Sequence, residues 1–374
     1  MLTSESQQSK NNPRIKVLYL YTGLNRSSLF EPVAKGIIPN SAFRGYFELK
    51  NAPALDVSLF DLSGTLNQFP PLVKKIFPND VLYLFSLPKV LSYDCVIASE
   101  VYLLGLVASL YGKLARKPKW IYVPINSSVL VTRHKRNFIK RFSLSVFWRS
   151  FSRIAYITES QRRDFVNLGV KNDALVYVPF GVDVNFFNST YKDSDDDYVL
   201  SIGRDLGRDF SALFRVAKLL PYKFIVATSP SNVPEGSDIP DNLLVYYNLS
   251  PEEIRMLYKK ARIVALFLDE DGSVKGSDCT GQTVMLEALS ASRPVFATNR
   301  AWIREYFNEG QEYCAVPKGS DAEIAQTLTS LWNDTDLRFT LSRNGYQAVT
   351  RKYSSSAYAS RVEKLIHDLY AKSI

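Results

Sequence analysis

Residues 279–298, CTGQTVMLEALSASRPVFAT, hold the clearest structural signal in this chain. Gly281 begins a small-residue turn, and Thr283 can cap the helix that follows. Apolar residues recur at helical spacing from 284 to 289, which predicts a helix with one buried side. Pro294 then stops the helix, and the apolar run after it predicts a short strand. A turn, a helix and a strand in this order are typical of an α/β fold.

The turn at Gly281 also has the chemistry of a binding site. A tight glycine turn that leads into a helix leaves several backbone N–H groups unpaired, and together they carry about half a positive charge. Such a helix start suits a phosphate. Glu287, one turn further on, can accept hydrogen bonds from sugar hydroxyls. Many α/β helices begin in this way for structural reasons alone, so both interpretations remain open here.

Length and composition indicate a folded protein of two domains. The chain has 374 residues, of which 46% are hydrophobic and 22% charged, enough to bury large cores. The first 13 residues are polar, so we expect a disordered tail rather than a secretory signal. The longest apolar run, 101–111, is too short to span a bilayer. The three cysteines match no zinc or disulfide pattern. A cytoplasmic location fits these features best.

Positive charge is concentrated in one part of the chain. The formal net charge is +9, yet residues 101–158 contain no Asp or Glu and eleven Lys or Arg. A surface with this much charge attracts nucleic acid, anionic lipid or a phosphorylated substrate. No helix-turn-helix, zinc or RNA-binding motif accompanies it, so we do not expect nucleic acid as a partner.

Short apolar runs that predict strands alternate with helical stretches in two series, and the acidic segment 193–197 separates them. Alternation of this kind predicts parallel sheets covered by helices on both faces. We expect a helix from 27 to 37 and a helical end to the chain. The expected units are an N-terminal domain 14–182 with the C-terminal helix 356–374, and a second domain 198–353.

The basic segment 132–153 carries two apolar stripes. Phe138, Ile139 and Phe142 share one side of a helical wheel, and a second stripe lies about half a turn away. One straight helix cannot bury both stripes against one surface, so we expect a break near 143–145. The first half can rest on a membrane or form a solvated basic face. The membrane-facing candidates are Lys135, Arg136, Phe138, Lys140 and Arg141.

A second candidate site follows the first strand of the second series. Gly203, Arg204 and Arg208 lie in a turn at the carboxyl end of that strand, where open α/β sheets bind ligands. Two arginines there can bind a diphosphate, or they can belong to a surface network of ion pairs with neighbouring aspartates. The acidic triplet 269–271 resembles a metal site, although it fits a solvated loop better.

From about residue 151 onward, the chain resembles the GT-B glycosyltransferases of family 4, which are retaining and nucleotide-sugar-dependent. Several motifs in a fixed order carry the resemblance: VPFGVDVNFF at 178–187, LSIGR at 200–204 with Arg208 and Asp209, LSPEEIRMLYKKAR at 249–262, and 281–295. The resemblance implies two Rossmann-like, doubly wound domains that face a central crevice. It also implies a C-terminal helix that crosses back to the first domain.

The resemblance also implies roles for the candidate residues. The two arginines would hold the donor diphosphate, Glu287 the ribose, and the backbone of the glycine turn the sugar and phosphate. The implied catalytic residues are Arg204 and Arg208; the implied donor-binding residues are Gly203, Cys279, Gly281, Gln282, Thr283, Val284 and Glu287. On the acceptor side we expect Gly23 and Asn126. Arginine takes the place of a metal in this fold, so we expect neither metal nor cofactor.

Two departures from the family pattern affect the site. Cys279 stands where the family usually has a first glutamate, eight positions before Glu287. No histidine lies at 124–126, where the family has one near the acceptor. We expect the loop 269–278 to supply the missing contact to the donor sugar, with Asp278 as the nearest candidate.

These features predict an enzyme that moves a sugar from a nucleoside-diphosphate sugar to a glycan or lipid-linked acceptor, in polysaccharide or glycoconjugate synthesis. Two alternatives remain open. One is a GT-B-type sugar-nucleotide epimerase, against which the missing histidines count. The other is a non-catalytic sugar-nucleotide-binding partner of a transferase, which Cys279 favours.

Overall fold

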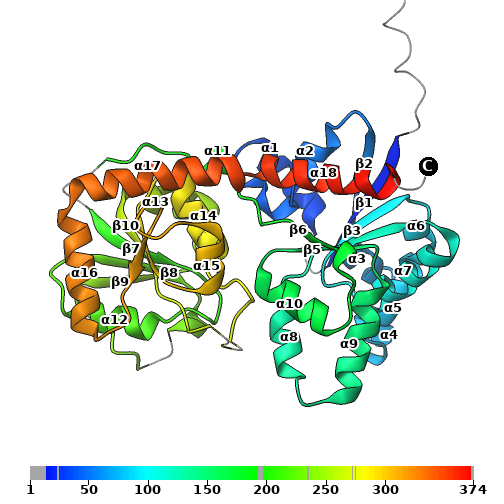
Figure 1. The fold of residues 1–374 in the computed structure, drawn as a ribbon, viewed down its shortest axis with the longest axis horizontal. Helices are drawn as coiled ribbons and strands as arrows, with labels where there is room; N and C mark the ends of the chain where they lie inside the picture. Colours follow the sequence, from blue (N-terminus) through cyan, green and yellow to red (C-terminus); the bar gives the residue numbers. More distant parts are fainter. Residues whose placement is uncertain are drawn as a thin grey trace, which may run out of the picture.

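A computed structural model describes residues 14–22, 25–192, 197–233, 236–271, 273 and 275–371. The chain forms two α/β domains that face each other (Figure 1). The expected tail 1–13 and the acceptor-side candidate Gly23 lie outside the described residues.

The first domain contains a sheet of six parallel strands in the order β2-β1-β3-β4-β5-β6. These strands are nearly continuous apolar runs because a parallel sheet is buried on both faces. The strands are β1 Ile15–Tyr21, β2 Leu55–Asp61, β3 Cys95–Ala98, β4 Lys119–Tyr122, β5 Arg153–Tyr156 and β6 Leu175–Tyr177. The α-helices of this part are α1 Phe30–Ala34, α2 Tyr46–Lys50, α3 Leu62–Leu66, α4 Pro71–Ile76, α5 Asn79–Leu82, α6 Leu87–Leu91, α7 Leu103–Ala115, α8 Ser127–Arg133, α9 Phe138–Ser150 and α10 Glu159–Asn167. Short 3₁₀ turns span Arg26–Leu29, Asn40–Phe43, Tyr83–Ser86 and Asn172–Ala174.

The second domain contains another sheet of six parallel strands, in the order β12-β11-β10-β7-β8-β9. Its strands are β7 Tyr198–Ile202, β8 Phe224–Thr228, β9 Leu243–Tyr247, β10 Ala261–Leu266, β11 Val295–Thr298 and β12 Cys314–Val316. The helices are α12 Phe210–Lys218, α13 Pro251–Lys260, α14 Gln282–Ser290, α15 Ala301–Tyr306, α16 Asp321–Asn333 and α17 Thr335–Lys352, with a 3₁₀ turn at Pro230–Asn232. Side chains of α12 and α16 form the core on one face of this sheet, and those of α13, α14 and α17 form the core on the other.

Two connections join the domains. The short helix α11, Val184–Phe187, follows the last strand of the first domain. After α17, the helix α18, Ser355–Ala371, runs back over the first domain (Figure 1). Tyr358, Val362 and Ile366 of α18 are buried in the core under β1 and β2. The two α/β domains and the returning C-terminal helix are therefore confirmed.

Three local predictions were wrong. The expected helix 27–37 is a 3₁₀ turn followed by the short α1. The basic segment breaks at 134–137, not at 143–145, and α9 is continuous. Its first stripe is mostly exposed, since Phe138 is 82% and Phe142 63% exposed, so α9 does not have to bury both stripes. Thr283 does not cap α14, because Gly281 occupies the N-cap position in a left-handed conformation.

Candidate functional site

Arg208 is a buried cation that follows the first strand of the second domain. Its Nη2 donates a 3.0 Å hydrogen bond to the Ser201 hydroxyl. Its Nε and Nη1 are also buried and meet no acceptor from the described part of the chain. Burial lowers the pKa of Arg208 to about 10, although Tyr258 and Asp205 act in the opposite direction. A guanidinium with two unpaired buried nitrogens is suited to bind an anion.

The backbone at Gly203 lies close to the Arg208 side chain. Gly203 has φ +152°, and a Cβ there would lie 3.2 Å from Nε of Arg208. The Gly203 carbonyl accepts a 2.6 Å hydrogen bond from the Thr228 hydroxyl, which fixes the end of β7. Arg204, the second implied diphosphate ligand, is exposed and donates from Nη2 to the Leu249 carbonyl at 3.3 Å. The two arginines therefore differ sharply in burial.

Asp205 ties the two candidate turns together. Its carboxylate accepts hydrogen bonds from the backbone N–H of Gly207 (2.9 Å) and Ser277 (3.0 Å), and from the hydroxyls of Ser277 (2.7 Å) and Thr280 (2.9 Å). Thr280 immediately precedes Gly281. The turn before Arg208 and the turn before α14 are thus parts of one structure. The sequence analysis missed this role, although Asp-x-Gly is a known turn signal.

Glu287 lies on α14 beside Tyr258 of α13. The Tyr258 hydroxyl donates to Oε2 of Glu287 at 3.0 Å, and Tyr258 itself is fully buried. Burial raises the pKa of Glu287 to about 7, although the hydrogen bond from Tyr258 acts in the opposite direction. Tyr258 also interacts electrostatically with Arg208, the other implied donor-binding group. The sequence analysis missed Tyr258, but its spacing from Ile254 marks it as part of a buried stripe.

The other donor-binding candidates lie in the turn that opens α14. Gly281 has φ +82°, and an added Cβ would stand 3.0 Å from the side chains of Leu266 and Leu268. Gln282 is buried and its Nε2 has no acceptor in the described part of the chain. Val284 is buried, whereas Thr283 is exposed. Only glycine fits the N-cap position without strain.

The surroundings of Cys279 and Asn126 give less indication of a binding role. Cys279 is buried in the core cluster of the second domain, and this burial raises the pKa of its thiol well above the usual range. Asn126 is half-buried and donates from its side-chain amide to Glu100 at 2.9 Å. Asp278 does not face the donor turn with its carboxylate. Both of its oxygens accept hydrogen bonds from the first domain instead.

The acidic triplet contacts protein groups. Asp271 pairs with Nε of Arg300 at 3.1 Å and accepts from the N–H of Ala301 at 3.0 Å. Asp269 accepts from the Ser273 hydroxyl at 3.1 Å. Over the described ranges, no three His, Cys, Asp or Glu residues are arranged to hold a metal ion.

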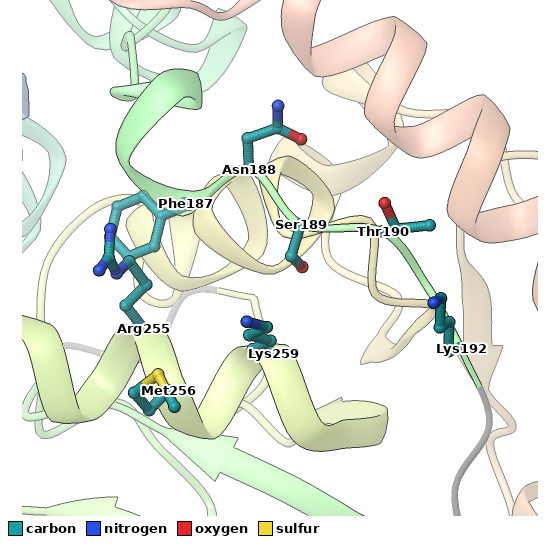
Figure 2. A pocket seen from close by; sticks show the side chains of 8 residues that line it. All are labelled: Phe187, Asn188, Ser189, Thr190, Lys192, Arg255, Met256 and Lys259. Carbon is teal, nitrogen blue, oxygen red and sulfur yellow. The ribbon is translucent and has the colours of Figure 1, made fainter.

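A separate cavity of about 470 Å³ lies between the segment after α11 and the outer face of α13. Arg255, Met256 and Lys259 of α13 line it, with Lys192 at its far end (Figure 2). Arg255 is already paired with Glu252 at 2.7 Å. The cavity contains none of the candidate site residues, so the donor turn is the better candidate site.

Residues 213–334, about a third of the chain, match the family model described as "Glycosyl transferases group 1". No curated protein sequence matches the chain significantly. In the part of the chain that the structure describes, no helix has the length and apolar character needed to cross a membrane.

Several solved structures share the fold. HepE from Anabaena, in complex with UDP and glucose, has 12% identity and a TM-score of 0.65, over 95% of this chain and 100% of that chain. Sucrose-phosphate synthase from Thermosynechococcus elongatus has 13% identity and a TM-score of 0.69, over 96% of this chain and 100% of that chain. A glycosyltransferase from Rickettsia africae has 12% identity and a TM-score of 0.65, over 96% of this chain and 99% of that chain. The chain thus has the GT-B fold, and the match within its second domain supports a place in glycosyltransferase group 1.

Proposed function

We propose that the protein is a retaining glycosyltransferase of family 4 that uses a nucleoside-diphosphate sugar. The second domain, 198–353, would bind the donor. The first domain, 14–182 with helix 356–374, would bind the acceptor. One observation carries the proposal: Arg208 is a buried guanidinium, beside a glycine turn at a helix start, and two of its nitrogens meet no acceptor among the described residues. The UDP in the Anabaena complex supports a nucleoside diphosphate as the first ligand to test.

In this reaction the protein would contribute mainly by placing charged and polar groups, and not by forming a covalent bond to the sugar. The bond between the sugar C1 and the β-phosphate oxygen breaks, and the acceptor oxygen bonds to C1 on the same face. The acceptor proton passes to the departing diphosphate. Negative charge then grows on the β-phosphate, where Arg208 and the N–H groups of the Gly281 turn can stabilise it. One well-aimed donor to such charge contributes about 3 kcal/mol, so no metal is required in this proposal.

A thermal-shift screen against a panel of nucleoside diphosphates and their sugars tests the donor proposal. We expect one nucleotide to raise the melting temperature and its sugar to be hydrolysed slowly without acceptor. Binding without hydrolysis or transfer would favour a non-catalytic partner, and conversion of the free sugar nucleotide would favour an epimerase. Absence of any shift would contradict nucleotide binding.

We further propose a lipid-linked acceptor in polysaccharide or glycoconjugate synthesis, at the cytoplasmic face of an anionic membrane. Phe138, Ile139 and Phe142 at the start of α9 are 82%, 76% and 63% exposed. The surrounding basic residues are Arg133, Lys135, Arg136, Lys140 and Arg141. Each basic residue near an anionic bilayer contributes about 1 kcal/mol, and the apolar side chains add attraction that salt does not screen.

Sedimentation with vesicles tests the membrane proposal. We expect binding to vesicles with anionic lipid, weaker binding at high salt, and little binding to neutral vesicles. Glutamate at Lys135, Arg136, Lys140 and Arg141 should abolish it. A matched control carries glutamate at the exposed Lys223, Lys259 and Lys260 of the opposite domain and should still bind. Equal binding to both vesicle types would identify the patch as a solvated face.

A further inference from the structure

Asp278 reaches from the second domain to the first. Its Oδ2 accepts hydrogen bonds from the Ser127 hydroxyl (3.2 Å), the Ser128 N–H (2.8 Å) and Nε2 of Gln161 (2.8 Å). Its Oδ1 accepts from the Val129 N–H at 2.9 Å. A carboxylate has about four acceptor positions, and four donors of the first domain reach this one.

The partners of Asp278 are held in place to meet it. Ser128 and Val129 lie in the first turn of α8, where free N–H groups and the helix dipole favour a carboxylate. Gln161 is fully buried, and its Oε1 accepts from the Ile157 N–H at 2.9 Å, which turns its Nε2 toward Asp278. Each of these bonds involves an ionised acceptor, so each is stronger than a neutral hydrogen bond.

On its other side, Asp278 is continuous with the donor turn. The preceding residue, Ser277, donates its N–H and its hydroxyl to Asp205. Asp205 in turn accepts from the N–H of Gly207, the residue before Arg208. Only direct hydrogen bonds and adjacent residues therefore separate Arg208 from the first turn of α8. This helix follows β4, and its Ser128 and Val129 line a cavity together with Ser277 and Asp278 of the second domain.

We propose that Asp278 is a positioning residue that couples the donor turn to α8 and fixes the position of the acceptor domain relative to the donor. The inference rests on the proposed function. In this proposal Asp278, which directly precedes Cys279, acts on the first domain and not on the sugar. Donor contacts lie in the second domain, so loss of the link should lower turnover and leave donor affinity unchanged.

A second contact between the domains provides a matched control. Oε2 of Glu305 accepts from the N–H of Glu159 at the start of α10, at 2.9 Å. This is also a carboxylate from the second domain at a helix start in the first. Glu305 lies on α15 and shares no hydrogen bond with Asp205 or Ser277. Glu305→Gln therefore weakens the interface and leaves the hydrogen bonds of Asp205 and Ser277 in place.

The test compares Asp278→Asn with Glu305→Gln, using the nucleoside diphosphate and sugar identified by the thermal-shift panel. We expect Asp278→Asn to lower kcat for transfer at least tenfold while donor KM and nucleotide Kd stay within threefold. Glu305→Gln should change each constant by less than threefold. Ser127→Ala, which removes one of the four hydrogen bonds, should lower kcat two- to fivefold with unchanged KM. If Asp278→Asn does not fold, this variant tests the proposal in its place.

Hydrogen exchange of α8 provides a readout that needs no turnover. In the wild type, the hydrogen bonds to Asp278 should slow exchange at the N–H groups of Ser128 and Val129. This protection should disappear in Asp278→Asn, although the nucleotide still protects α14. The inference is overturned if kcat is unchanged, if donor affinity falls as much as kcat, or if α8 remains protected in the variant. Failure of the wild type to bind any nucleotide would instead overturn the proposed function.

Discussion

Arg208→Met should separate donor binding from stability. The pKa of Arg208 is lowered from 12.5 to about 10, and one unit corresponds to about 1.4 kcal/mol, so burial of the charge costs about 3 kcal/mol. Both the folded and the unfolded chain are protonated at pH 7. The full cost is therefore present there, and it is relieved only as the pH rises through about 10.

Methionine keeps most of the volume of Arg208 and removes the charge. The hydrogen bond to Ser201 is lost, at about 1–2 kcal/mol. Ser201 remains satisfied because its hydroxyl donates to the Ala265 carbonyl at 2.8 Å. We therefore expect the variant to be as stable as the wild type or about 1–2 kcal/mol more stable.

Nucleotide affinity should fall in Arg208→Met, in contrast to stability. Two nitrogens of Arg208 have no hydrogen-bond partner in the described ranges and can bind phosphate oxygens. Each charge-assisted hydrogen bond contributes about 1.5–3 kcal/mol. The loss in nucleotide affinity and in kcat/KM should therefore reach about 100-fold or more, since about 1.4 kcal/mol is tenfold.

Urea unfolding and calorimetric titration with the nucleoside diphosphate measure both quantities. Arg215→Met is the control, because Arg215 belongs to the same domain, is exposed and pairs with Asp321 at 2.9 Å. Its nucleotide affinity should equal that of the wild type. Affinity of Arg208→Met within threefold of the wild type, or a loss of more than about 2 kcal/mol in stability, would refute the reasoning.

Three further substitutions test the donor turn. Burial raises the pKa of Glu287 to about 7, above its unfolded value, so wild-type stability should fall as pH rises from about 4.5 to 7. Glu287→Gln should match the wild type near pH 4.5 and exceed it by up to about 3 kcal/mol at pH 8 in urea unfolding, and lower stability there would contradict this. Gly281→Ala should lose about 1–3 kcal/mol in the same assay, because the left-handed backbone and the Leu266 side chain oppose a Cβ; an unchanged midpoint would count against the strain. Burial acts to raise the pKa of Asp205, but its hydrogen bonds, those from Ser277 first, outweigh it and lower the value. Asp205→Asn should therefore cost about 1–3 kcal/mol at pH 7, and the difference from the wild type should shrink as the pH falls through the folded pKa; a constant difference would argue against the ionised form.

Much of the fold could be predicted from local sequence. The strand runs at 198–202, 223–227 and 243–247 became β7, β8 and β9 with ends shifted by at most one residue. Parallel strands buried on both faces leave continuous apolar runs, which need no tertiary information to recognise. The break in the basic segment was predicted wrongly, because the prediction assumed that both stripes of α9 are buried. Which stripe meets a partner depends on the packing of α9 against the rest of the domain.

The sequence by itself determined the chemistry available to the donor turn: glycines at 203 and 281, a cationic Arg208 and a carboxylate at 287. Only the tertiary structure decided how these groups are paired. Asp205 meets Ser277 across 72 residues of sequence, and Tyr258 meets Glu287 across 29. The sequence likewise could not reveal that Asp278 binds α8, 149 to 151 residues away, instead of a sugar. Helical and strand periodicity is a property of neighbouring residues and can be read along the chain. A hydrogen bond needs two groups within about 3 Å in fixed directions, and only the packing of both domains brings those groups together.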